Sequence, residues 1–116
     1  MGLSTLTYLL EGEIRHKDSL GSDQWVKPSD VSGMMAGSAI AHVERPPKSL
    51  MASGFRMHSL QIWQASPKEH EQGHGYYSHY STEPLPFSDN LGVKIRIIAG
   101  SGFCLESPVP VRSPTL

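Results

Sequence analysis

The sequence predicts an all-β fold, and three observations support this prediction. Short segments alternate apolar and polar residues with a period of two, as in the run around Leu6, Tyr8 and Leu10, which is typical of half-buried strands. Glycine and proline separate these segments. No long stretch repeats its apolar residues with the 3.6-residue period of a helix. Many short strands with turns between them favour a sandwich, a jelly roll or a small barrel.

The turns divide the chain into short strands in order. Gly12 ends the first strand, and the Asp, Ser and Gly of residues 18–21 close the second. Pro28 and Pro46 stop the third and fifth strands, because proline has no amide proton for a ladder. A further turn is expected at residues 36–38. The expected strands are residues 5–10, 13–17, 24–27, 31–35, 40–44, 57–63 and 93–99.

Two regions do not fit this pattern. Residues 64–92 are rich in Ser, Pro, His and Tyr, and we expect a long surface loop there. Residues 101–116 contain Pro108, Pro110 and Pro114 and are expected to be extended and untethered, like a linker between domains. We therefore predict one domain over residues 1–100, followed by a proline-rich linker over residues 101–116.

Composition excludes several classes of function. The 116 residues suffice for one modest domain. Ten Lys and Arg against eleven Asp and Glu leave a formal charge of −1, so we expect no direct nucleic-acid binding. The single cysteine, Cys104, cannot form an internal disulfide or a thiolate-rich zinc site. No apolar run approaches the ~20 residues that span a bilayer, so we expect no membrane partner and a cytoplasmic location.

His42 and Glu44 are the first candidates for chemistry. They lie two residues apart on an expected strand, so their side chains leave the same face. Imidazole nitrogen and carboxylate oxygen are two of the three donors in the 2-His-1-carboxylate iron site. The same spacing is also common in solvated surface pairs, and the residues alone leave both interpretations open.

The other candidate side chains have simpler interpretations. His16, on a polar strand, is expected to be a solvated cross-strand residue. His58 shares a face with Leu60 and Ile62. Cys104 has no neighbouring histidine or cation in sequence, which gives a catalytic thiolate little support. We expect His70, His74 and His79 to be solvated in the long loop, and Trp25, Trp63, Met34, Met35, Met51 and Met57 to fill the core.

A series of ordered segments resembles the pirin family. The segment from Thr7 to Gly21, with its run Glu-Gly-Glu-Ile-Arg-His-Lys-Asp-Ser, resembles the first cupin motif of pirins, and His-Val-Glu-Arg-Pro at residues 42–46 resembles the run that ends in His-x-Glu. Later landmarks follow in the same order at residues 58–63, 92–100 and 112–116, so the resemblance covers nearly the whole chain. It implies a cupin-type jelly-roll barrel, incomplete at its N-terminal end, with the linker leading toward an absent second cupin.

The resemblance also implies a metal site. Pirins hold one iron with three histidines and one glutamate, and His42 and Glu44 match the last two ligands, with Glu44 also a candidate base. The family has a histidine at the position of His58, which implies a place in the second shell or the substrate pocket. The family's first two histidines precede the segment that begins here at Gly2. We therefore expect Fe(II) binding by this truncated chain to be weak or absent.

Two functions follow from this resemblance. The first is an Fe(II)-dependent dioxygenase of the quercetin 2,3-dioxygenase type, acting on a flavonoid-like small molecule and impaired because two ligands are absent. The second is a non-catalytic module that binds a protein partner, like a transcription coregulator, and is nuclear if the source is eukaryotic. A jelly roll without its opening strands exposes pairing edges, so we also expect a homo-oligomer to form through them.

Overall fold

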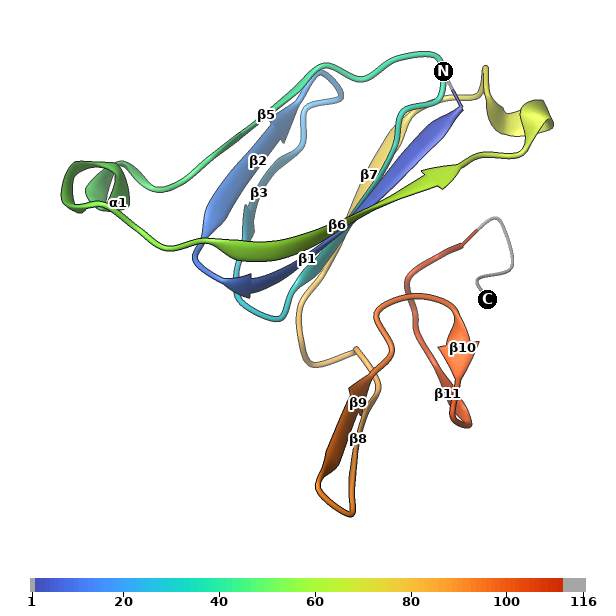
Figure 1. Ribbon diagram of the computed structural model, residues 1–116. Helices are drawn as coiled ribbons and strands as arrows, with labels where there is room; N and C mark the ends of the chain where they lie inside the picture. The colour runs from blue at the N-terminus through green and yellow to red at the C-terminus, as the bar shows by residue number, and fades with distance from the viewer. Residues whose placement is uncertain (1, 112–116) are drawn as a thin grey trace.

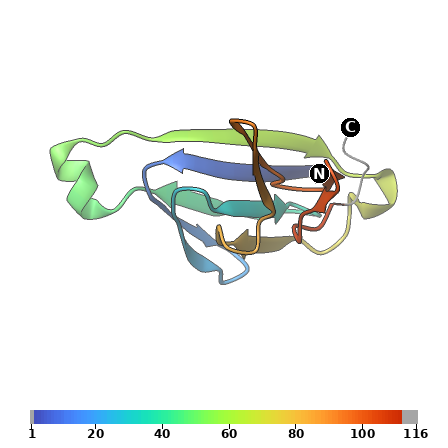
Figure 2. The same ribbon diagram turned by 90° about the horizontal axis from the view of Figure 1, so that it is seen from below.

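The computed structural model describes residues 2–111, and two antiparallel sheets that face each other form its main body (Figure 1). The large sheet contains, from edge to edge, β6 (His58–Ala65), β1 (Leu3–Glu11), β4 (Val31–Met35) and β7 (Tyr76–Tyr80). The small sheet contains β3 (Asp23–Val26), β2 (Ile14–Asp18) and β5 (His42–Arg45). Figure 2 shows the four strands of the large sheet side by side. The prediction of an all-β fold is confirmed.

Short elements complete the chain. The helix α1 (Lys48–Ser53) lies at one end of the molecule, between β5 and β6 (Figure 1). A 3-10 turn, η1 (Lys68–His70), precedes β7. Two hairpins follow, made of β8 (Phe87–Asn90) with β9 (Val93–Arg96) and of β10 (Ser101–Gly102) with β11 (Leu105–Glu106). No helix within residues 2–111 is long and apolar enough to cross a membrane.

The space between the sheets is filled from both sides. Leu9 of β1 packs with Ile14 and Val26 of the small sheet, and all three are buried. Burying side chains of this size stabilises the fold by about 1.5–3 kcal/mol each. Thr7, two residues before Leu9, is buried on the same face of β1. The odd-numbered residues of β1 thus form the inner face of the large sheet.

The outer face of the large sheet is covered over β1, β4 and β7 by the C-terminal part of the described chain. Val109 is buried against Val31 of β4 and Leu85. The expectation that residues 101–116 are untethered is therefore wrong for residues 101–111, because β10 and β11 pair there and an apolar side chain docks on the sheet. Residues 112–116 lie outside the described residues. The domain boundary at residue 100 stays a prediction.

The expected loop over residues 64–92 is also wrong, because β7 lies within it. This strand pairs with β4 over five positions, from Val31↔Tyr80 to Met35↔Tyr76. Its three tyrosines favour a strand. All five residues of β7 are half-buried, since the outward side chains are covered as well as the inward ones. Its sequence therefore lacks the apolar–polar alternation by which β1 to β6 and β9 were predicted.

The strand β6 forms an exposed edge of the large sheet. Leu60, Ile62 and Trp63 are each about half exposed or more, with Trp63 at 65%. The expectation that Trp63 belongs to the core is wrong, because no other described strand continues the sheet beyond β6. Trp25 is partly exposed under the guanidinium of Arg15. Of the four methionines expected in the core, Met35 is buried, Met34 is half-buried, and Met51 and Met57 are exposed.

Candidate functional site

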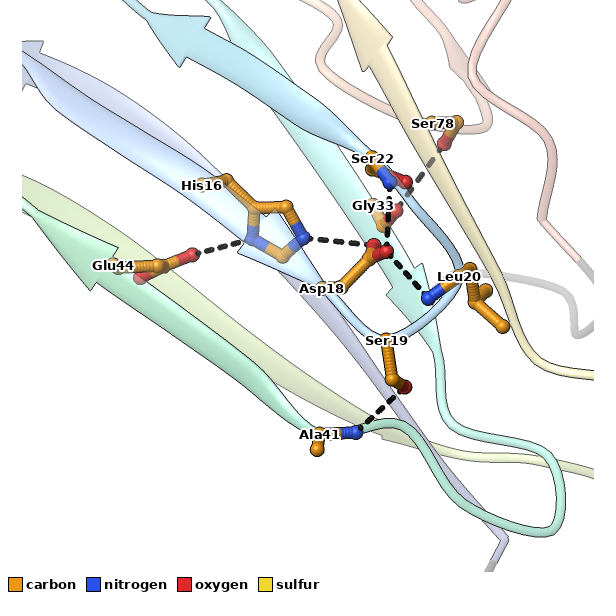
Figure 3. Close-up of polar contacts among 9 residues, drawn as sticks. All are labelled: His16, Asp18, Ser19, Leu20, Ser22, Gly33, Ala41, Glu44 and Ser78. Atoms are coloured by element: carbon orange, nitrogen blue, oxygen red, sulfur yellow. Dashed lines mark hydrogen bonds and ion pairs between the residues drawn. The ribbon is translucent and has the colours of Figure 1, made fainter.

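A buried histidine lies at the centre of the candidate site. His16 is 1% exposed, and its two ring nitrogens contact two carboxylates (Figure 3). Its Nε2 lies 3.0 Å from Oδ2 of Asp18, and its Nδ1 lies 3.4 Å from Oε1 of Glu44. The expectation of a solvated His16 is wrong, because β2 turns the face that carries Ile14 and His16 toward the large sheet. The sequence signal for this burial is Ile14, an apolar residue two positions before His16 and therefore on the same face of the strand.

Asp18 is held rigidly beside this histidine. Its side chain is fully buried, and its Oδ1 accepts hydrogen bonds from the backbone N–H groups of Leu20 and Ser22 at 2.9 and 3.0 Å (Figure 3). Burial by itself raises the pKa of Asp18, but the hydrogen bonds from His16, Ser22 and Leu20 outweigh it and lower the pKa to about 2. Asp18 is therefore a carboxylate at neutral pH. The turn predicted at residues 18–21 thus places backbone N–H groups around this carboxylate.

His42 and Glu44 lie opposite this pair on β5. The ladder pairs Asp18 with His42 and His16 with Glu44. Residues opposite each other in an antiparallel ladder point to the same face, so all four side chains share one face of the small sheet. The ring centroids of His16 and His42 are 5.7 Å apart, and the rings are nearly parallel. The Glu44 side chain keeps 30% exposure and can reach solvent or a ligand.

Tyr77 of β7 forms the opposite wall of the site. Its ring stacks on His16 with centroids 3.9 Å apart and planes within 6°. Its hydroxyl is buried without a partner in hydrogen-bond geometry among residues 2–111. Burial raises the pKa of Tyr77 to about 12; the nearby Ser32 hydroxyl opposes the shift, and the charges of Glu44, Asp18 and Asp30 add to it. Tyr77 was missed in the sequence because its segment was expected to be a loop.

The other histidines lie apart from this group. His79 is 2.9 Å from Oδ2 of Asp30, so the expectation of a solvated His79 is wrong. His70 is half-buried in η1, and His74 is exposed. His58 is exposed at the start of β6, on the outer face with Leu60 and Ile62. Among residues 2–111, no hydrogen bond or ion pair joins His58 to Glu44.

The donors of the site do not form a complete metal cage. Within residues 2–111, no three His, Cys, Asp or Glu side chains are placed to hold one metal ion together. A cavity of about 460 Å³ lies elsewhere, between the outer face of the large sheet and residues 98–111. None of His16, Asp18, His42, Glu44 or Tyr77 lines it. Cys104 is exposed between β10 and β11.

Comparisons with known proteins agree with this architecture. The chain is 48% identical to a pirin-like protein of Caulobacter vibrioides over 98% of its own length and 40% of that protein's length. It superposes on a quercetin 2,3-dioxygenase of Acinetobacter baumannii with a TM-score of 0.88 and 34% identity, over 98% of this chain and 36% of that one. It also matches the bacterial pirin YhhW of Escherichia coli in complex with nickel(II), with a TM-score of 0.56 and 34% identity, over 68% of this chain and 31% of that one.

The first two similarities extend along nearly the whole chain, which spans about two fifths of the length of the curated relatives it matches. The fold is that of the pirin and quercetin dioxygenase cupins. The family model described as Pirin matches residues 1–64, which include His16, His42 and Glu44. On this evidence, the chain belongs to the pirin family.

Proposed function

We propose that the chain is part of a metal-dependent cupin dioxygenase of the quercetin 2,3-dioxygenase type, with His42 and Glu44 as two of its metal ligands. The observation that carries this proposal is the placement of His42 and Glu44 on one face of β5, directly opposite the buried pair His16 and Asp18. The similarity to a quercetin 2,3-dioxygenase and to a nickel-bound pirin supports it. The proposed ion is Fe(II), and the proposed substrate is flavonoid-like.

The chemistry of the two donors fits such an ion. Imidazole and carboxylate both suit Fe(II), and both side chains are exposed enough for an ion to reach them. A firmly bound iron needs more protein donors than these two. Because no third donor stands with them among residues 2–111, we expect this chain to bind Fe(II) weakly and to show impaired activity.

The residues of the chain have distinct roles in this proposal. A bound iron supplies Lewis-acid and redox chemistry. Glu44 Oε1 faces His16 Nδ1, which leaves Oε2 to bind the ion or to accept the proton of a flavonol hydroxyl. The aromatic wall of Tyr77 excludes water from one side of His16. Tyr77 itself stays protonated at neutral pH.

Metal titration tests this proposal. We expect His42→Ala and Glu44→Gln each to weaken anaerobic Fe(II) binding by at least about tenfold, because the first removes a nitrogen donor and the second removes the negative charge of an oxygen donor. His58→Ala is the matched control, since His58 lies on the outer face of the large sheet. Calorimetric titration gives the affinities, and quercetin consumption with oxygen uptake gives the activity. Equal Fe(II) affinity in all four proteins would contradict the proposal, and a loss in His58→Ala would restore that residue to the site.

A second candidate function is association with another protein through β6. This strand has an unpaired edge in the described chain and contains neither a charged residue nor a proline, the usual protection of such edges. A second copy is a suitable partner. In antiparallel pairing centred on Gln61, Leu60 of one copy would face Ile62 of the other on the outer face.

We expect the chain to be a dimer or larger in solution, and Ile62→Lys to shift it toward monomer by placing two charges near each other in that pairing. Light scattering after size-exclusion chromatography measures the mass over a concentration series. Leu91→Lys adds the same charge at a residue that is 96% exposed and far from β6 in sequence, and it should leave the mass unchanged. A monodisperse wild-type monomer with a cooperative melt would rule out this association.

A further inference from the structure

We propose that His16, anchored by Asp18, is a positioning residue that fixes the carboxylate of Glu44 beside His42. This inference rests on the proposed role of Glu44 as a metal ligand, and it adds a role for His16 and Asp18. Neither residue is proposed as a ligand, because His16 contacts Asp18 and Glu44 through its two ring nitrogens, and Asp18 contacts His16 and two backbone N–H groups.

The orientation of the His16 ring is determined by its surroundings. Nε2 is held by Asp18, which is itself held by the backbone N–H groups of Leu20 and Ser22. Tyr77 stacks on the ring at 3.9 Å, with His42 5.7 Å away. Flipping the ring would break the contact with Asp18 in a fully buried place. His16 therefore presents Nδ1 to Glu44 in one fixed direction.

Glu44 needs such a partner more than His42 does. Its side chain is long and partly exposed, and β5 lies at the edge of the small sheet. An unheld glutamate there would occupy several rotamers. The 3.4 Å contact from Oε1 to Nδ1 restricts it. A carboxylate oriented in advance binds an ion more tightly, and partners of this kind typically account for about 10–100-fold in metal affinity.

Three substitutions at His16 separate positioning from packing. His16→Phe keeps a flat ring for Tyr77 but removes both nitrogens. His16→Asn places an amide nitrogen at the same position along the side chain as Nδ1, toward Glu44, whereas His16→Gln places one at the position of Nε2, toward Asp18. His79→Phe is the matched control, because it removes both ring nitrogens and so breaks a 2.9 Å histidine–aspartate contact that does not involve Glu44.

We expect His16→Phe to weaken anaerobic Fe(II) binding about 10–100-fold, His16→Asn to recover most of that loss, and His16→Gln to recover little. His79→Phe should bind as wild type does. The second readout needs no metal: the ¹³C signal of the Glu44 carboxyl should shift in His16→Phe and return in His16→Asn. Circular dichroism confirms that each variant is folded.

The outcomes separate the two proposals. An unchanged Glu44 signal in His16→Phe, or equal recovery by the Asn and Gln variants, would overturn the positioning role whatever the metal does. If wild-type protein and Glu44→Gln bind Fe(II) alike while the Glu44 signal still depends on His16, the metal function fails and the contact between His16 and Glu44 stands as a structural one only.

Discussion

Replacing Asp18 with alanine is expected to lower the free energy of unfolding by about 3–5 kcal/mol, because each donor left without its acceptor costs about 1–3 kcal/mol and Asp18 contacts three such groups. The substitution leaves the His16 Nε2 and the N–H groups of Leu20 and Ser22 without their acceptor. These groups meet at the end of β2, so their loss also loosens the turn that leads into β3. Urea unfolding followed by circular dichroism measures the change.

Asp23→Ala is the matched control for this substitution. Asp23 also pairs with a basic residue of β2, through a two-point contact with Arg15 at 2.6 and 2.7 Å. Both of those side chains are exposed, and exposed ion pairs contribute little to stability. We therefore expect a much smaller loss for Asp23→Ala. Equal losses for the two variants would mean that the hydrogen bonds of Asp18 are not what stabilises the turn.

The pH dependence of stability gives an independent check on Asp18. Its pKa is about 2 in the folded protein, against an ordinary value of 3.8. The unfolded chain therefore binds a proton more readily, and the stabilisation is present above about pH 4 and lost as the pH falls toward 2. Asp18→Asn should reduce this acid sensitivity. An unchanged stability curve between pH 4 and 2 in Asp18→Asn would contradict the assignment.

Gly37→Ala is expected to be the most damaging of the glycine substitutions, with a loss of about 2–5 kcal/mol. Gly37 has a φ of +54°, which a residue with a side chain rarely adopts. An added Cβ would also lie only 2.7 Å from the backbone nitrogen of Gly75 and 2.8 Å from the carbonyl carbon of His74. The loop at residues 73–75 leads directly into β7, so its displacement should move Tyr77 away from His16.

Gly21→Ala separates the two causes of this loss. Gly21 has a φ of +93°, but a Cβ there would meet nothing within 4 Å. It should therefore show only the conformational cost of about 1–2 kcal/mol. Thermal unfolding ranks the two variants, and NMR shifts of the His16 ring report whether Tyr77 still stacks on it. A Gly37→Ala protein as stable as Gly21→Ala would show that the loop at residues 73–75 moves aside without lowering the free energy of unfolding.

Some of the site could be predicted from alternation along the chain. The spacing of His42 and Glu44 places them on one face because successive side chains of any strand alternate. The same rule connects His16 with Ile14 and with Asp18. It cannot show which face is covered, and His16 was therefore expected in solvent. Tyr77 could not be found at all, because β7 is half-buried on both faces and lacks a period of two.

The all-β class, the turns at residues 18–21 and 36–38, and the shared face of His42 and Glu44 follow from local features of the chain. Alternation, glycine and proline act over a few residues, so these features can be read without knowing the fold. The burial of His16, its contact with Tyr77 and the docking of Val109 depend on segments far apart in the sequence. These features are determined by how the sheets pack, because packing decides which face of each strand is covered. The same packing leaves β6 exposed at the edge of the large sheet.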